Sequence, residues 1–317
     1  MSDGSPRGLT PPPVPPLLPQ APFDDPSADV ILRTSDGMDL RVHRLACIAR
    51  LQADVPSPVF RQMFQLPQPQ CEPDVPIVSM TESALVLDRL LRFFYPGTEP
   101  TAPDDLEQLR EILDVALRKY DMASLAVLGR HYLRLHIGLS PVGVYAIACR
   151  YEWKDVALEA AKESLKYRLR IFGTTPPVQL QHITADRYHS LLDYHAQCSQ
   201  VTRAATSSLT WLTYSGDRIC FTCSQGPRPK HLLLADGAAA WSTQWFADYL
   251  QNAGGVLGKT PAAKLDSTSL LDGPLRNLAK CSVCSTNGFQ QLMDFARDTL
   301  PEQIALRIDA VELKLNF

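Results

Sequence analysis

The stretch DVILRTSDGMDLRVHR, residues 29–44, decides the fold of the first part of the chain. Residues 30–32 are a short apolar run rich in β-branched side chains, and residues 35–37 are a turn signal. Apolar and polar residues then alternate over 38–42. A strand, a turn and an alternating strand predict a β-hairpin with one buried face.

The residues after this hairpin predict a helix and then a further strand. Ser57 suits the N-cap of a helix, Pro58 suits its first position, and Phe60 lies on its apolar face. Residues 75–80 are mostly apolar, but the prolines Pro73 and Pro76 place the predicted strand at a sheet edge. Thr81 is expected to cap the helix that follows this strand.

Two more helical patterns complete the first part of the chain. A start resembling a capping box at 104–107 leads into an amphipathic stripe that ends at Tyr120, and a second helix covers 125–135. Strands and helices therefore do not alternate regularly. This order predicts an α+β fold rather than βαβ units.

Residues 138–317 are expected to form a mostly α-helical region. Helical patterns cover most of its first half, at 142–150, 156–170 and 185–212. Scattered glycine, proline and lysine predict loops at 224–240 and 251–276. Between these loops, Trp241, Trp245, Tyr249 and Leu250 fit one helical face, and the C-terminal residues 306–317 fit a strand and a helix equally well.

Composition limits the class of protein. The chain has 317 residues, enough for about two domains. Its net charge of −3 argues against coating nucleic acid by bulk charge. We find no apolar run long enough to span a membrane and no signal-peptide pattern. Eight cysteines are too dilute for a disulfide scaffold, so we expect an intracellular protein of the cytoplasm or nucleus, with reduced thiols.

Residues 1–28 are expected to be a disordered tail, because the run PPPVPP at 11–16 favours polyproline II. A ligand for a proline-binding domain is the alternative interpretation of its PxxP spacing.

The segments 29–32, 37–44, 57–64 and 87–97 together resemble a BTB/POZ domain. With residues 144–148, 194–195 and Cys198, the chain is similar to a fungal group that pairs this domain with a helical C-terminal region. The resemblance implies a BTB/POZ domain over 29–137, built of short strands and a helical cluster, and a mostly helical region over 138–317.

The resemblance also implies a function. BTB/POZ domains are protein-interaction modules that form homodimers or heterodimers, so we expect a non-enzymatic protein that self-associates and recruits partners. Two finer roles are the alternatives: a substrate adaptor for a cullin-type ubiquitin ligase, and a nuclear transcriptional regulator with a structural zinc site. Pull-down with a cullin would favour the adaptor, and salt-dependent DNA binding would favour the regulator.

Four residues fall on recurrent positions of the family: Asp29, His43, Ser57 and Phe60. The resemblance implies that Asp29 and His43 are structural and form a partly buried polar pair near the first helix. Fourteen positions separate His43 from Ser57, more than the family has, so residues 51–56 are interpreted as an insertion near the dimer interface or as an error in the gene structure.

The strongest chemical signal is a pair of CxxC motifs, Cys220/Cys223 and Cys281/Cys284. Each two-residue spacer lets two sulfurs meet one ion, so the four thiolates could hold a structural zinc in tetrahedral geometry. The 57 residues between the motifs are more than a zinc ribbon has, but loop-closure entropy grows only logarithmically with length. His195 and Cys198 could face the same place, and four ordinary semi-buried cysteines are the alternative.

A relaxed phosphate-loop pattern at 253–260 ends in Lys259 and Thr260. Phosphate binding there needs a buried strand before the loop and a helix after it. The residues before it have a helical pattern, so we interpret the match as chance and expect no nucleotide hydrolase.

Overall fold

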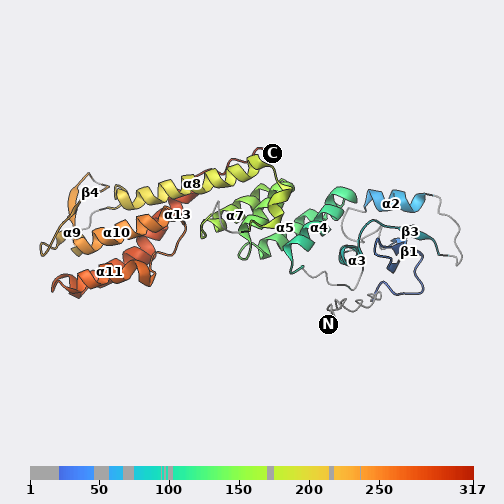
Figure 1. Ribbon diagram of the computed structural model, residues 1–317, viewed down its shortest axis with the longest axis horizontal. Helices are drawn as coiled ribbons and strands as arrows, with labels where there is room; N and C mark the ends of the chain where they lie inside the picture. Colours follow the sequence, from blue (N-terminus) through green and yellow to red (C-terminus); the bar gives the residue numbers. More distant parts are fainter. Residues whose placement is uncertain are drawn as a thin grey trace, which may run out of the picture. The chain divides into compact units, whose positions relative to one another are not determined.

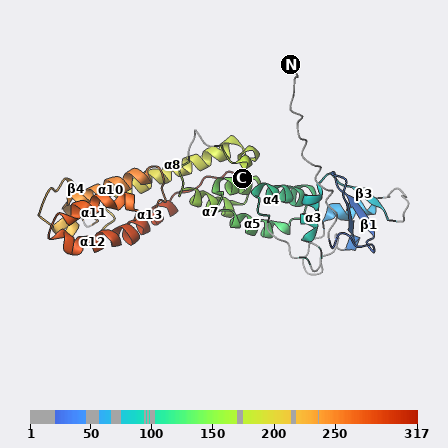
Figure 2. The same ribbon diagram turned by 60° about the horizontal axis from the view of Figure 1, so that its bottom comes forward.

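The computed structural model describes residues 21–45, 57–66, 75–93, 95, 98, 103–169, 175–213, 218–235 and 237–317. The chain divides into two compact units, Met1–Tyr132 and Leu133–Phe317. Figures 1 and 2 show strands and short helices in the first unit and long helices in the second. This agrees with the predicted α+β class and mostly helical C-terminal region. The proline run at 11–16 and the insertion at 51–56 lie outside the described residues.

A three-stranded mixed sheet forms the centre of the first unit. The predicted hairpin is confirmed: β1 (Val30–Arg33) pairs antiparallel with β2 (Asp39–Val42), with Val30 opposite Val42. The predicted third strand, β3 (Ile77–Ser79), pairs in parallel with β1, so the strand order is β2-β1-β3. The first three residues of β1 are all buried, as expected for the central strand of a covered sheet.

The helical segments of this part of the chain come after the hairpin. They are α2 (Pro58–Gln65), α3 (Ala84–Arg92), α4 (Leu106–Leu113), one stretch of π-helix η1 (Asp114–Lys119), and α5 (Leu125–Leu135). Leu87, Leu90 and Leu91 of α3 are fully buried, and so is Leu32 of β1. The amphipathic spacing of the helices therefore produces one apolar core in this unit.

The α3 cap differs from the prediction. Ser83, not Thr81, occupies the N-cap position, and its side chain makes no capping bond. Instead, the carboxylate of Asp36 in the β1–β2 turn accepts the backbone N–H of Ala84, at 3.0 and 3.2 Å. Gly37, with φ +82°, allows the turn that brings Asp36 to this position.

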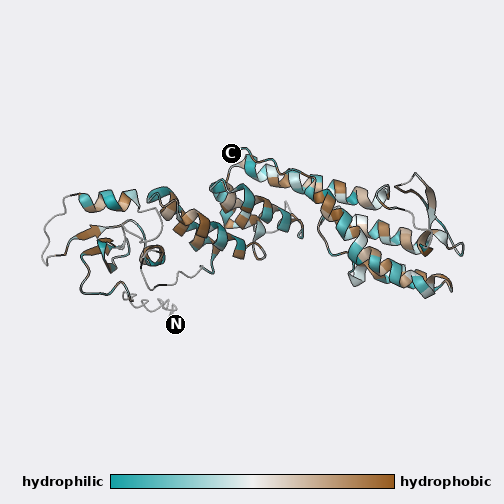
Figure 3. Ribbon diagram, turned by 180° about the vertical axis from the view of Figure 1, so that it is seen from behind, coloured by the Kyte–Doolittle hydropathy of each residue, from teal (hydrophilic) through white to brown (hydrophobic). Residues whose placement is uncertain are grey.

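The second unit begins with a helical pair, α6 (Pro141–Arg150) and α7 (Lys154–Ser164), followed by a short 3₁₀ segment η2 (Val178–His182) and the long helix α8 (Ala185–Ser207). Helix α6 is buried almost all round and packs on α7 and η2. The alternating brown and teal of the long helices in Figure 3 shows the amphipathic pattern that their packing requires.

The rest of this unit is a small hairpin and a layer of helices. Its elements are α9 (Ile219–Thr222), β4 (Lys230–Leu233), β5 (Ala239–Ser242), α10 (Gln244–Leu257), α11 (Thr268–Ala279), α12 (Cys284–Asp294), the π-helical η3 (Phe295–Thr299) and α13 (Leu300–Asp309). Helix α10 packs on α8 and α11, and α13 packs on α8.

Both predicted loops in this part of the chain are wrong in part, because each range also contains regular structure. Residues 224–240 contain β4 and the first two residues of β5, and the two strands pair antiparallel with Leu232 opposite Ala240. Residues 251–276 contain the second half of α10 and most of α11, including Pro274 within the helix. Trp241 lies on β5 and is 50% exposed, so it does not share the buried helical face of Trp245, Tyr249 and Leu250.

Candidate functional site

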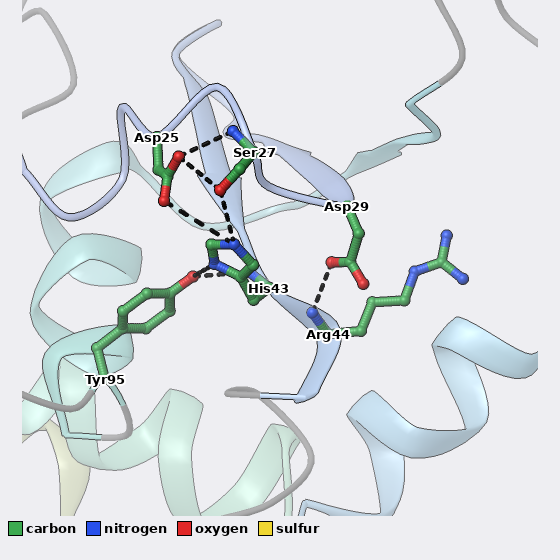
Figure 4. A network of polar contacts seen from close by, with 6 residues as sticks. All are labelled: Asp25, Ser27, Asp29, His43, Arg44 and Tyr95. Carbon is green, nitrogen blue, oxygen red and sulfur yellow. Dashed lines mark hydrogen bonds and ion pairs between the residues drawn. The ribbon is translucent and has the colours of Figure 1, made fainter.

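A polar network joins residues 25–29 to the end of β2 and to Tyr95 (Figure 4). The backbone N–H of His43 donates to the Tyr95 hydroxyl at 2.6 Å, and His43 Nδ1 lies 3.2 Å from the same oxygen. On the other side of the ring, Nε2 lies 3.4 Å from Ser27 Oγ and 3.9 Å from the Asp25 carboxylate. Hydrogen bonds from Ser27 lower the pKa of Asp25. The network therefore holds residues 25–27 beside the end of β2.

This network places Asp29 apart from His43. Asp29 is exposed, and its carboxylate accepts the backbone N–H of Arg44 at 2.7 Å (Figure 4). The partners of the His43 ring are Tyr95, Ser27 and Asp25. The expected partly buried Asp29–His43 pair is therefore not formed: the Asp29 carboxylate binds the backbone of Arg44, whereas the His43 ring contacts the side chains of Tyr95, Ser27 and Asp25.

Residues before Asp29 also belong to the packed structure. Phe23 is fully buried, its ring meets Tyr95 edge to face at 5.0 Å, and its carbonyl accepts the N–H of Arg41 at 2.9 Å. The ordered part of the first unit therefore begins before Asp29, within the segment predicted to be a tail. The signal for this in the sequence was a single aromatic residue after a proline-rich stretch.

Ser57 caps α2 as predicted and makes a second bond as well. Its Oγ accepts the N–H of Phe60 at 3.1 Å and donates to the carbonyl of Tyr120 at 2.7 Å. The rings of Phe60 and Tyr120 stack with centroids 4.5 Å apart. Both predicted family positions, Ser57 and Phe60, thus attach α2 to the chain beyond η1.

A buried acid, Glu82, extends this connection and was not found from the sequence. The Tyr120 hydroxyl donates to Glu82 at 2.8 Å, and the Lys119 ammonium pairs with the same carboxylate. Burial raises the pKa of Glu82, but the bonds from Lys119 and Tyr120 outweigh it and bring the pKa below its usual value. Burial and the charge of Glu82 raise the pKa of Tyr120. We interpret this network as structural, because it joins elements of one core.

In the second unit, three of the four predicted zinc ligands lie together. The Sγ atoms of Cys223, Cys281 and Cys284 are all within 4.8 Å of one another, and Cys223 Sγ lies 3.7 Å from Cys281 Sγ. The N–H of Cys284 lowers the pKa of the Cys281 thiol, whereas burial raises the pKa of Cys284 to about 12. The indole Nε1 of Trp245 donates to Cys284 Sγ at 3.4 Å.

Cys220 is not part of this group of three. It belongs to α9 and is 4% exposed, and burial raises the pKa of its thiol to about 12, with a further contribution from the Cys284 thiol. His195 and Cys198 do not join the cluster. His195 Nε2 lies 3.3 Å from the Tyr167 carbonyl, and Cys198 is buried within α8. The expectation that they share the cysteine site is therefore wrong.

The phosphate-loop pattern is a chance match, as predicted. Gly254 and Gly255 lie inside α10, and Lys259 follows the helix end. A Cβ on Gly254 would lie 2.5 Å from Thr206 Oγ1, so this glycine allows α10 to approach α8 closely. Without a strand before it, the segment offers no row of backbone N–H groups to a phosphate.

Comparison with known proteins identifies the first unit. Residues 23–136 match the BTB/POZ domain family, and they include the whole sheet and helices α2 to α5. No curated protein matches the chain. Of the described helices, none has the length and apolar character needed to cross a membrane. The chain thus contains a BTB/POZ domain at residues 23–136, followed by a mostly helical region.

Proposed function

We propose that this chain is a non-catalytic interaction protein whose BTB/POZ domain binds a second copy of itself. The observation that carries the proposal is the BTB/POZ match over 23–136, because this domain is a protein-interaction module. The polar groups described in the first unit support a non-catalytic role, because the hydrogen bonds of His43, Glu82 and Ser57 hold elements of that unit together.

Exposed apolar side chains beside α2 are the surface we assign to self-association. Leu45 is 76% exposed and Leu66, directly after α2, is 63% exposed. The guanidinium of Arg44 lies 6.0 Å from the Phe64 ring centroid, so residues 44–45 lie next to the C-terminal end of α2. Exposed apolar residues gathered at one place favour a protein interface over open solvent.

The experiment compares two aspartate substitutions at equally exposed apolar positions. Leu45→Asp changes the assigned surface, and Val127→Asp, on α5 at 78% exposure, is its matched control. The full chain is studied by size-exclusion chromatography with light scattering over a dilution series. We expect Leu45→Asp to weaken dimerisation at least tenfold, since a charge would be buried unpaired, and Val127→Asp to leave it unchanged. Equal weakening by both, or no effect of Leu45→Asp, would refute the assigned surface.

A cullin-type ligase adaptor is the second candidate role. It needs two binding modules on one chain, and the compact second unit, Leu133–Phe317, has an apolar core of its own and follows the BTB/POZ domain in the sequence. A cullin scaffold retained by the full chain, and released by surface substitutions in the BTB/POZ domain, would support this role. Absence of cullin binding at micromolar protein would exclude it.

A further inference from the structure

We propose that Cys220, Cys223, Cys281 and Cys284 hold one structural zinc ion that joins α9 to the start of α12. The inference concerns the second unit and goes beyond the interaction function of the BTB/POZ domain. It rests on a cluster of soft sulfur ligands, which is the donor set that Zn²⁺ takes in structural sites.

The spacing of the sulfurs fits a tetrahedral thiolate site. With Zn–S bonds of about 2.3 Å, the edges of a tetrahedron of four sulfurs are about 3.8 Å long. The Cys223–Cys281 distance is 3.7 Å, and all three clustered sulfurs lie within 4.8 Å of one another. Among the described groups of cysteine, histidine and acidic side chains, this is the cluster that brings three ligand atoms together.

The groups around the sulfurs are those that a zinc thiolate site uses. The N–H of Cys284 points to Cys281 Sγ at 3.5 Å, within the second CxxC motif, and the indole of Trp245 donates to Cys284 Sγ at 3.4 Å. Donors directed at a ligand sulfur stabilise its negative charge and fix its orientation. An open pocket of ≈ 340 Å³, lined by Gln225, Cys281 and Cys284, gives the ion a route to the site.

Cys220 is assigned as the fourth ligand because it completes the CxxC motif with Cys223, which directly follows α9, and because its side chain is buried on that helix. Its backbone carbonyl accepts the N–H of Thr243 at 2.9 Å, which holds α9 against the end of β5. A zinc ion held by three sulfurs alone would have a fourth coordination position occupied by solvent. With Cys220 as the fourth ligand no such position remains, so the site has no place for catalysis.

The local fold gives the ion a role. Helix α9 has four residues, and β4 and β5 form a two-stranded hairpin. An isolated hairpin and a single helical turn are marginal in water. A zinc ion bridging α9 and α12 links this segment to the helical layer across 57 intervening residues, as structural zinc does in small metal-bound modules.

The test measures zinc in the full chain, purified under reducing conditions without chelator, by inductively coupled plasma mass spectrometry. We expect about one zinc per chain in the wild type. Cys281→Ser is the main variant, since Cys281 is only partly buried and its replacement leaves the core packing intact. The matched control is Cys198→Ala, which removes a buried thiol of α8 outside the cluster.

We expect Cys281→Ser to lose the zinc and Cys198→Ala to keep it. X-ray absorption on the wild type should show four sulfurs at about 2.3 Å, a readout that does not depend on the folding of any variant. A zinc-free wild type, zinc retained in Cys281→Ser, or a Cys223–Cys281 disulfide in the native protein would overturn the proposal. Full zinc content in Cys220→Ser would overturn the assignment of Cys220 as the fourth ligand.

Discussion

Removing one hydroxyl from the core of the BTB/POZ domain is predicted to loosen that domain alone. Tyr120→Phe deletes the donor that lies 2.8 Å from the buried Glu82 carboxylate but keeps the ring stacked on Phe60. A hydrogen bond to a charged group contributes about 1.5–3 kcal/mol. Glu82 would keep its ion pair with Lys119, so we expect Tyr120→Phe to lower the stability of the domain by an amount within this range.

The assay is hydrogen exchange with mass spectrometry on the full chain, read at the peptides of α2. The N–H of Phe60 is bonded to Ser57, which in turn is bonded to Tyr120, so this helix reports the network. A loss of about 1.5–3 kcal/mol corresponds to exchange about 10- to 150-fold faster. All four tryptophans lie after residue 132, so their fluorescence should report an unchanged second unit.

The control is the same tyrosine-to-phenylalanine substitution at an exposed position. The Tyr167 hydroxyl donates to the Gly138 carbonyl at 3.3 Å, and Tyr167 is 48% exposed, so Tyr167→Phe should alter exchange little. The Glu82 pKa is below its usual value of 4.5, so its contribution is present above that pH and is lost as the pH falls through the folded-state pKa. Unchanged exchange of α2 in Tyr120→Phe at neutral pH would refute the reasoning.

Two further predictions concern helix packing and capping. Gly254→Ala should destabilise the second unit by about 1–3 kcal/mol, because its Cβ would meet Thr206 Oγ1 at 2.5 Å. Gly255→Ala, which has open space at its Cβ, should stabilise the unit by about 0.5–1 kcal/mol. Denaturation followed by tryptophan fluorescence measures both free energies of unfolding, and equal effects of the two substitutions would contradict the described packing of α10 on α8. Asp36→Ala should cost the BTB/POZ domain about 0.5–2 kcal/mol by removing the α3 cap, and Asp36→Asn less, as read by exchange of the α3 peptides. The Asp36 pKa lies below 3.8, mainly because its carboxylate accepts a hydrogen bond from Thr34. The difference in stability between wild type and Asp36→Ala should therefore persist above that pH and disappear as the pH falls through the lowered pKa. A stability difference that stays constant through this range would contradict the capping role.

Local signals in the sequence predicted much of the BTB/POZ domain. The alternation over 38–42 predicts β2, and the Ser57-Pro58 pair predicts the start of α2, because both depend on neighbours in the chain. The α3 cap was predicted wrongly because its acceptor, Asp36, is 48 residues away. Glu82 was missed for the same reason: its partners Lys119 and Tyr120 come from a distant helix.

The second unit was harder to predict because packing overrides propensity there. Gly254, Gly255 and Pro274 are poor helix formers, so the pattern over 251–276 favoured a loop. Gly254 is in fact needed where α10 meets α8, and α11 tolerates Pro274 in its interior. The two CxxC motifs were found by their spacing, but only the fold shows that Cys223, Cys281 and Cys284 approach one another while His195 does not.

Self-association of the full chain tests the central claim most directly. Sedimentation velocity on the wild-type protein over a dilution series measures the mass of the species in solution. Our account predicts a dimer of twice 35.2 kDa that dissociates on dilution. A single species of 35.2 kDa at every concentration up to the micromolar range would contradict it.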